Sequence, residues 1–421
     1  MRLLEAIKAY IAALDKPAHD MNGAGEIPGV LPPPMIRYRP PFAHAAHHDA
    51  RGDARQIVYE SLINKSFEPA DAHAIAAHFV DYYAEILHTE RVPYQDGVYR
   101  ELENTTVWCK RISDLINIFM RKISAGEIKP PSTPEGWSRM DSCCHADRNA
   151  RKTMEDRHIA IHDLSAWSIE GEDDSTREAV KKTSLFAVFD GHGGHEVAAY
   201  AAAHFPTAFV EAGAVADEET MKNAFNLFDK RVSVRCETEP WRCGSTAVVA
   251  AVNDKQVALG WCGDSSILML RPMEVERLTT NHTPHNEDEA RRVEAAGGSL
   301  IWLQGELRVN GVLNVTRSLG DVQGRPMIIS DPDTKVIERG IADYALILAC
   351  DGVAEELKDS EIFDSVKKFC TTHPAEDWHK LAAHVCDVAS DVSNDNLSCL
   401  FVFLRPPSDL WAAFNPIDDD E

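Results

Sequence analysis

The feature that most constrains the fold is a set of short apolar runs, each with an aspartate at one end. The runs and their acids are SLFAVF with Asp190, ALILAC with Asp351, LSCLFVFL with Asp395, and QVALGWC, which leads through Gly263 to Asp264. Apolar runs of this length, bounded by Gly, Asn or Asp, are typical of buried strands. The aspartates can therefore converge on one point at the ends of several strands.

Carboxylates that converge in this way repel one another. Two of them at about 4 Å repel by about 4 kcal/mol at an effective dielectric of about 20, so four stay ionised together only around a cation. All-oxygen ligands favour Mg²⁺ or Mn²⁺, and two such ions about 3.5–4 Å apart can clamp a phosphoryl group. An Asp-Gly pair after a strand is, however, also common in turns. From the residues alone, the metal-site and turn interpretations are about equally supported.

Four further residues carry possible chemistry. His192, in FDGHGGH, lies two residues after Asp190 and can act as a general acid or as an ordinary hydrogen-bonding histidine. Arg151 has a guanidinium suited to a phosphate dianion, although arginine is also common on surfaces. Glu155 and Asp156 form another acidic pair, which could equally be a solvated helix start.

Composition excludes several classes of protein. The chain has 421 residues, of which 44% are hydrophobic, and a formal net charge of -24. An acidic protein of this kind is not expected to bind nucleic acid generally. Charged residues interrupt the apolar N-terminus, and no uncharged run approaches the ~20 residues that span a bilayer, so we expect no signal peptide and no membrane partner. We expect a cytoplasmic protein, and a nuclear location is compatible with the sequence.

The ten cysteines include no C-x-x-C pair, so the sequence indicates neither a zinc site nor a disulfide framework. Cys350 and Cys399 have apolar neighbours and are predicted to be core thiols.

The chain is predicted to divide into four parts. These are a helical N-terminal partner-docking domain (1–123), a linker rich in Pro, Gly and Ser (124–136), a catalytic domain (137–405) and an acidic C-terminal tail (406–421). Apolar spacing predicts N-terminal helices over 1–23, 54–63, 70–87 and 107–123.

In the second half, helices are predicted after Gly194, over 218–236 and over 287–296. The last has Asn286 as N-cap, with Glu289 placed for a capping box. The polar stretch 171–182 is predicted to be an exposed loop.

Taken together, the motifs resemble a known family. They are RKTMED, FAVFDGHGGHEVA, GSTAV, WCGDS, EARRVEAAGG, RVNGVLNVTRSLGD, LACDG and NDNLS. In this order they are similar to the motif series of the PPM (type 2C) metal-dependent protein serine/threonine phosphatases, over roughly residues 138–405. The resemblance implies an α+β fold: a β-sandwich of two antiparallel sheets flanked by helices, here preceded by the helical N-terminal domain.

The resemblance also implies a role for each site residue. Asp190 would bridge two Mn²⁺ or Mg²⁺ ions, with Asp351, Asp395 and the carbonyl of Gly191 as further ligands, Glu155 acting through water, and Asp264 helping to hold a weaker third ion. Arg151 would bind the phosphate of phosphoserine or phosphothreonine proteins, and His192 would be the general acid. A hydroxide bridging the two ions would attack phosphorus in line, without a phosphoenzyme.

Three positions depart from the common pattern of the family: Ser266, where arginine is frequent, and Asn314 and Thr316. None is a metal ligand in the family. The segment 280–311 would include a flap beside the active site that contributes to substrate choice.

A finer resemblance, carried by RVNGVLNVTRSLGD, GRPM, FLRPP and IRYRPPF, is to the branch of nematode sex-determination (feminization) phosphatases, and more widely to the CaM-kinase phosphatases. It implies a role in sex determination. It also implies partnership with other feminization proteins, including a cullin-type ubiquitin ligase substrate receptor, through the N-terminal domain.

Two other functions compete with the phosphatase. A scaffold with a decayed phosphatase fold is opposed by the complete set of expected metal ligands. A phosphohydrolase with a covalent aspartyl intermediate would need a D-x-D motif, which Asp190-Gly191-His192 does not provide.

Overall fold

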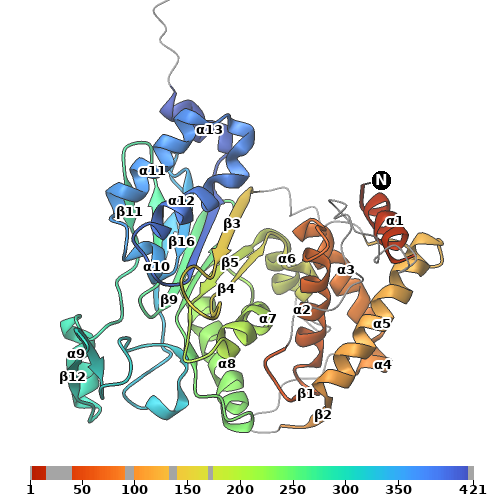
Figure 1. The fold of residues 1–421 in the computed structure, drawn as a ribbon, viewed down its shortest axis with the longest axis horizontal. Helices are drawn as coiled ribbons and strands as arrows, with labels where there is room; N and C mark the ends of the chain where they lie inside the picture. The colour runs from red at the N-terminus through yellow and green to blue at the C-terminus, as the bar shows by residue number, and fades with distance from the viewer. Residues whose placement is uncertain (1, 16–39, 91–98, 132–139, 169–173, 416–421) are drawn as a thin grey trace, which may run out of the picture. The chain divides into compact units, whose positions relative to one another are not determined.

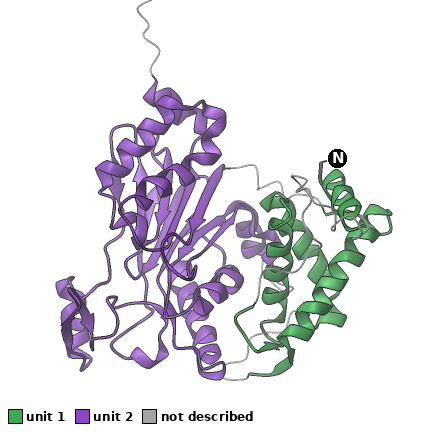
Figure 2. Ribbon diagram, viewed as in Figure 1, with its two compact units in different colours: residues 1–134 green, residues 135–421 purple. Residues whose placement is uncertain are grey.

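The computed structural model describes residues 2–15, 40–90, 99–131, 140–168 and 174–415 (Figure 1). The chain divides into two compact units, Met1–Pro134 and Glu135–Glu421 (Figure 2). Within the described ranges, no helix is both long enough and apolar enough to cross a membrane.

The first unit is mainly helical. Its helices are α1 (Arg2–Leu14), α2 (Ala50–Ile63), α3 (Pro69–Tyr82), α4 (Ala84–Leu87) and α5 (Thr105–Ser124), and strands β1 (His44–Ala46) and β2 (Glu101–Asn104) form an antiparallel pair. The predicted helix over 1–23 ends at Leu14, and its part beyond Asp15 lies outside the described residues, as does most of the proline-rich IRYRPPF segment. The predicted helix over 70–87 is interrupted at Tyr83.

Helix α5 shows why these segments are helical. The side chain of Asn104 caps it by accepting a hydrogen bond from the amide of Thr106 at 3.0 Å. Trp108, Ile112 and Phe119 recur at helical spacing and are fully buried. Helix α1 packs on α5, and the hydroxyl of Tyr10 donates to Asn117 Oδ1 at 2.7 Å.

The second unit is built on two five-stranded antiparallel sheets. The first has the order β11 (Val275–Arg277), β10 (Ser266–Leu270), β16 (Ala345–Ala349), β17 (Leu397–Phe403) and β3 (Ser142–Asp147). The second has the order β15 (Asp333–Glu338), β9 (Gln256–Cys262), β8 (Ala247–Val252), β5 (Ser184–Phe189) and β4 (Arg157–Ile161). This confirms the predicted α+β fold with two antiparallel sheets.

Strands β5, β8, β16 and β17 are buried on both faces, which explains why their sequences are continuously apolar instead of alternating. Cys350 and Cys399 are buried free thiols, as predicted.

Helices cover both sheets (Figure 1). Helices α7 (Glu196–Glu211) and α8 (Glu218–Thr238) pack on the sheet that contains β5. Helices α11 (Asp359–Thr372) and α12 (Leu381–Ser390) pack on the sheet that contains β17, and α13 (Pro407–Phe414) packs on α11.

The structure adds a helix to one predicted segment and contradicts the prediction for another. The predicted acidic tail begins with α13, because Leu410, Trp411 and Phe414 are apolar at helical spacing and join the core. The predicted loop over 171–182 contains helix α6 (Asp174–Lys182). It is stabilised by ion pairs one turn apart, such as Arg177 with Asp174 at 2.9 Å, and by burial of Val180.

The segment between β11 and the small strand β14 (Leu319–Gly320) carries a flap. We define the flap as helix α9 (Glu287–Ala295) with the hairpin of β12 (Leu300–Leu303) and β13 (Glu306–Val309). Val293 and Val309 of the flap form a small hydrophobic core with Ile328, which follows β14. Asn286 caps α9 as predicted. The predicted capping box is wrong, because the carboxylate of Glu289 turns inward to two arginines and Thr316.

Candidate active site

The strands formed by two of the apolar runs place Asp190 and Asp351 close together. Asp190 follows β5 directly, and Asp351 opens the short helix α10 (Asp351–Ala354) two residues after β16 ends. Carboxylate oxygens of Asp190 and Asp351 and the Sγ of Cys350 all lie within 4.8 Å of one another. The structure thus brings together two of the predicted metal ligands, which are 161 positions apart in the chain (351 minus 190).

Asp156, immediately before β4, adds a buried carboxylate to this cluster. It is 2% exposed, and neither of its oxygens has a hydrogen-bond partner in the described part of the chain. Burial, and the negative charge of Asp351, raise its pKa to about 6. Burying an ionised carboxylate without a hydrogen-bond partner costs free energy, so a bound cation would stabilise the charged form of Asp156. The sequence paired it with Glu155 but assigned it no role.

Burial and neighbouring negative charges also raise the pKa values of two nearby carboxyl groups. Burial, followed by the charges of Asp156 and Asp351, raises the pKa of Asp190 well above its usual range. Burial and the charge of Asp351 also raise the pKa of Asp264, which is 3% exposed. A set of oxygen donors that cannot ionise together without positive charge fits a hard divalent cation such as Mn²⁺ or Mg²⁺. The residues present therefore fit the metal that the motifs imply.

Asp395 lies two residues before β17 and forms an ion pair with the guanidinium of Arg151. The Arg151 side chain is 58% exposed, so it can reach an incoming phosphate.

The loop that carries Arg151 is fastened by Asn396, the residue after Asp395. Its Nδ2 donates to the carbonyls of Arg148 and Thr153, both at 3.0 Å, and its Oδ1 accepts from the amide of Glu155 at 2.8 Å. Sequence reasoning gave Asn396 no role, although NDNLS was among the motifs.

Glu155 lies between this loop and the segment after β5. Its Oε1 accepts from the hydroxyl of Thr153 at 2.8 Å, and its Oε2 accepts from the amide of Gly194 at 3.2 Å. A Cβ on Gly191 would lie 2.6 Å from the carbonyl oxygen of Glu155. Only glycine therefore allows these two segments to approach so closely.

His192 lies on the small strand β6 (Gly191–His192), with its side chain 27% exposed. Its Nε2 is 2.6 Å from the Oδ2 of Asp321. Sequence reasoning missed Asp321 as a partner, although it ends the motif RVNGVLNVTRSLGD.

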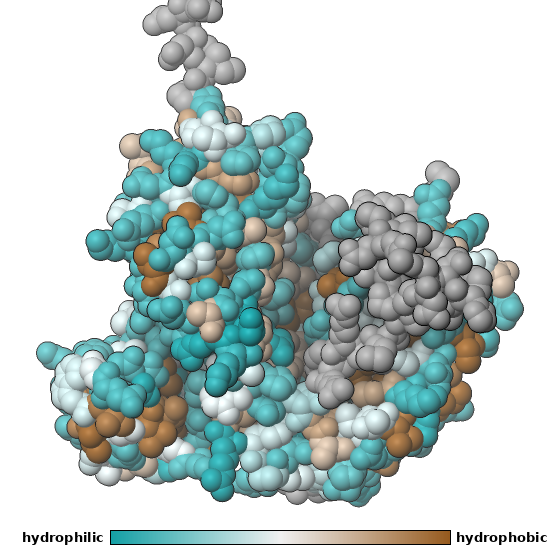
Figure 3. All heavy atoms as spheres, viewed as in Figure 1, coloured by the Kyte–Doolittle hydropathy of each residue, from teal (hydrophilic) through white to brown (hydrophobic). Residues whose placement is uncertain are grey.

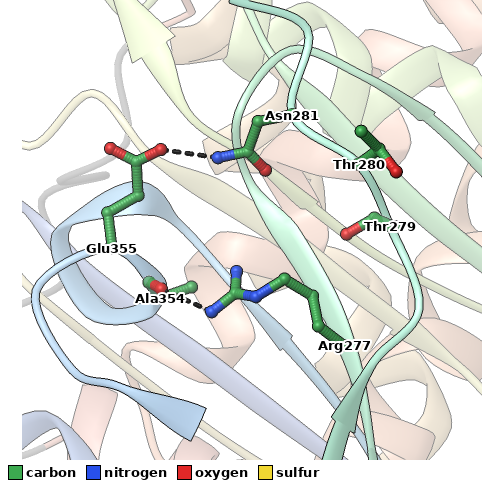
Figure 4. Close-up of a pocket in the computed structure, with 6 residues that line it drawn as sticks. All are labelled: Arg277, Thr279, Thr280, Asn281, Ala354 and Glu355. Carbon is green, nitrogen blue, oxygen red and sulfur yellow. Dashed lines mark hydrogen bonds between the residues drawn. The ribbon is translucent and has the colours of Figure 1, made fainter. Parts of the chain in front are cut away.

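A pocket of roughly 540 Å³ borders α10 (Figure 4). It is lined by Arg277, Thr279, Thr280, Asn281, Ala354 and Glu355. The side chains of Asn281 and Glu355 point toward one another, and Nδ2 of Asn281 donates to Oε1 of Glu355 at 2.5 Å (Figure 4). The amide of Glu355 donates to the carbonyl of Asp351 at 2.9 Å, so the pocket lies one helical turn from the carboxylate cluster.

Ser266, which departs from the common family pattern, has a defined role beside this pocket. Its hydroxyl accepts a hydrogen bond from Arg277 at 2.5 Å. The same guanidinium donates to the carbonyl of Ala354 and to Asp359, both at 2.7 Å, and so ties β11 to the segment after Asp351.

The flap exposes an apolar surface (Figure 3). Its most exposed large side chains are Ile301, Trp302 and Leu303, with Trp302 66% exposed. At the root of the flap, the amide of His282 donates to the carbonyl of Gly263, next to Asp264, at 2.8 Å.

Comparison with known proteins decides the family. Residues 140–396 match the family model described as protein phosphatase 2C, which is well over half of the chain. The chain belongs to the protein phosphatase 2C family. It is therefore a protein phosphatase by class, as the motif series predicted.

This phosphatase is 34% identical to protein phosphatase fem-2 of Caenorhabditis elegans over 428 residues, covering 98% of this chain and 92% of the relative. It is 33% identical over 404 residues to protein phosphatase 1E of Mus musculus, covering 93% of this chain but only 51% of that longer protein. A solved structure titled as a C. elegans sex determining protein matches with a TM-score of 0.79 and 34% identity, covering 88% of this chain and 91% of that one. The resemblance to the feminization branch is thereby confirmed.

Proposed function

We propose that this phosphatase hydrolyses phosphoserine and phosphothreonine in proteins with two Mn²⁺ or Mg²⁺ ions. Asp190, Asp351, Asp395 and the carbonyl of Gly191 would hold them, with Glu155 acting through water and Asp264 contributing to a weaker third site. The observation that carries the proposal is the cluster of carboxyl groups of Asp156, Asp190 and Asp264, whose pKa values are raised by burial and by their neighbours' negative charges. When bound, the ions would neutralise these carboxylates, activate water and polarise the phosphoryl group.

The chain's own residues do the remaining work. The side chain of Arg151 is exposed and exchanges Asp395 for a substrate phosphate, which offers its guanidinium stronger, bidentate hydrogen bonds. His192 donates a proton to the oxygen of the departing serine or threonine, whose alkoxide is otherwise a poor leaving group. The hydrogen bonds of the Asn396 side chain hold the Arg151 loop and Glu155 beside the start of β17.

The test is hydrolysis of a phosphothreonine peptide by the purified full-length chain, with Mn²⁺ titrated from none to excess. We expect turnover that requires metal and is removed by EDTA. The competing scaffold hypothesis predicts no turnover at any Mn²⁺ concentration, and that result would replace the present proposal.

We also propose a role in sex determination, which rests on the similarity to fem-2 along nearly the whole chain. Partners would be other feminization proteins, including a cullin-type ubiquitin ligase substrate receptor, bound through the first unit. Co-purification from native tissue, using a metal-ligand variant that retains its substrate, would identify both substrates and partners. Recovery of none of these proteins would remove the biological part of the proposal.

A further inference from the structure

A three-stranded miniature sheet lies at the end of β5 and aligns residues from three distant motifs. Its order is β14, β7 (Gly244–Ser245) and β6. His192 is paired with Gly244, and Gly244 is paired with Gly320 on the other side. Asp321 follows Gly320 directly, so the sheet sets the separation between the histidine ring and this carboxylate.

The carboxylate of Asp321 is held rigidly. Its Oδ2 accepts a hydrogen bond from the hydroxyl of Ser318 at 2.6 Å, and the side chain is only 9% exposed. The backbone at Asp321 has a φ of 43°, and its amide donates to the carbonyl of Cys243 at 3.3 Å. A left-handed backbone outside glycine is uncommon, and here it turns the carboxylate back over β7 toward His192.

Gly244 provides the space in which the two side chains meet. A Cβ at this position would lie 2.0 Å from Oδ2 of Asp321 and 2.6 Å from Nε2 of His192. No other residue fits beneath the pair without moving one member. The close contact between His192 and Asp321 therefore requires glycine at this position of the GSTAV motif.

The two nitrogens of the His192 ring have different surroundings. Nε2 is 2.6 Å from Asp321, whereas Nδ1 has no hydrogen-bond partner among the residues that the structure describes. Contact with a carboxylate fixes the orientation of an imidazole and determines which nitrogen remains available. The free nitrogen of this ring is therefore Nδ1.

We propose that Asp321 is a positioning residue for the general acid. This rests on the proposed function, in which His192 protonates the leaving oxygen. Asp321 holds the ring through Nε2 so that Nδ1 faces the substrate. As the P–O bond breaks, the proton on Nδ1 forms the O–H bond of the released serine or threonine, while the proton on Nε2 stays shared with Asp321.

The test compares full-length wild type with Asp321→Asn, a nearly isosteric change, on a phosphothreonine peptide and on p-nitrophenyl phosphate with Mn²⁺. Asparagine can present the wrong donor or acceptor to Nε2, so we expect kcat on the peptide to fall by about 10–100-fold with KM changed less than about 3-fold. The loss on p-nitrophenyl phosphate should be less than about 3-fold, because its leaving group needs no proton. Equal losses on both substrates, or no loss, would overturn the positioning role.

Double variants sharpen the test. In a His192→Gln background, Asp321→Asn should lower kcat on the peptide by less than a further factor of about 2, because the effects of residues that act as one unit are not additive. A full additional loss would overturn the proposal. Gly244→Ala should reproduce the loss that is specific to the peptide, and a normal peptide kcat in a folded Gly244→Ala variant would contradict it.

Matched controls separate this role from the rest of the site. Asp331→Asn changes an exposed aspartate ten residues further along and should leave both substrates unaffected. Mn²⁺ affinity by calorimetry should change less than about 3-fold in Asp321→Asn, and a large loss would make Asp321 part of the metal site instead. Absence of Mn²⁺-dependent turnover in wild type would overturn the proposed function itself, whereas failure of the Asp321 variants alone would leave it standing.

Discussion

At the scale of single residues, burial and mutual repulsion of several carboxyl groups dominate the electrostatics of the site. Asp156 has no hydrogen-bond partner in the described structure, and Asp190 and Asp264 have strongly raised pKa values. Replacing one of these acids with its amide removes repulsion in the metal-free protein and removes a ligand from the loaded one. Fold and activity should therefore respond in opposite directions to the same substitution.

We predict that Asp190→Asn or Asp351→Asn reduces Mn²⁺-dependent hydrolysis of phosphopeptides to background while the protein stays folded. Wild type should gain thermal stability as Mn²⁺ is added, because the ions bind only the folded state, and each variant should gain much less. Kinetics, circular dichroism and thermal melts with and without Mn²⁺ would check this. Near-normal turnover in a pure variant saturated with metal would show that the ligand assignment is wrong.

Arg151 and His192 should separate binding from chemistry. Arg151→Ala should raise KM by about 10–100-fold, the size expected when a charge-assisted hydrogen bond of roughly 1.5–3 kcal/mol is lost. His192→Gln should instead lower kcat on a phosphothreonine peptide by about 10²–10⁴-fold. Steady-state kinetics on p-nitrophenyl phosphate provide the control. An equal His192→Gln loss on both substrates would indicate a structural histidine.

At the scale of elements, a buried carboxylate on α9 helps to attach the flap to the sandwich. Glu289, on α9, accepts hydrogen bonds from Thr316 at 2.7 Å, from Arg292 at 3.0 Å and from Arg317 at 2.6 Å. Arg317 also pairs with Asp333 of β15 at 2.7 Å. Thr316, one of the departures from the family pattern, thus keeps a hydroxyl where the network needs a donor.

This network predicts a pH-dependent contribution to stability. Burial alone would raise the pKa of Glu289, but hydrogen bonds from Arg317, Thr316 and Arg292 lower it to about 2. Its stabilisation is therefore complete above the unfolded-state pKa of about 4.5 and is lost as pH falls toward 2. Glu289→Gln should cost about 2–3 kcal/mol at pH 7.

Urea unfolding from pH 7 down to pH 3 would check this, with the exposed Glu294→Gln on the same helix as control. The difference in unfolding free energy between wild type and Glu289→Gln should become smaller below about pH 4.5. If this free-energy difference does not change with pH, the charge of the Glu289 carboxylate contributes nothing to stability.

At the scale of the whole molecule, the catalytic motifs and the helical unit occupy separate parts of the chain. All residues proposed to act on phosphate lie in Glu135–Glu421, whereas Met1–Pro134 has its own buried residues, such as Trp108 and Phe119. A unit with its own core can serve as a docking module.

We predict that purified residues 137–421 keep peptide phosphatase activity within a few-fold of the full chain but lose partner capture in a pull-down. The alternative is a first unit that only adds stability. A truncated protein that is folded by circular dichroism yet inactive would show that the first unit contributes to catalysis. An active one that still captures every partner would place docking in the second unit.

The sequence by itself determined which segments are strands and which acids end them. SLFAVF and ALILAC are buried strands, and Asp190 and Asp351 follow them within two residues, so covalent adjacency carried these acids to the strand ends. Periodicity and adjacency are local properties, and the ordered motifs added the family and its fold.

Only the tertiary structure decided which distant side chains meet. The pairing of His192 with Asp321 spans 129 residues, and that of Asn396 with the Arg148 carbonyl spans 248. Glu289 does not form its predicted capping box because Thr316 and Arg317, more than 25 residues further along, together with Arg292 of its own helix, offer more hydrogen bonds than one backbone amide. Local patterns do not record such contacts, because their free energy exists only once the chain has brought the partners together.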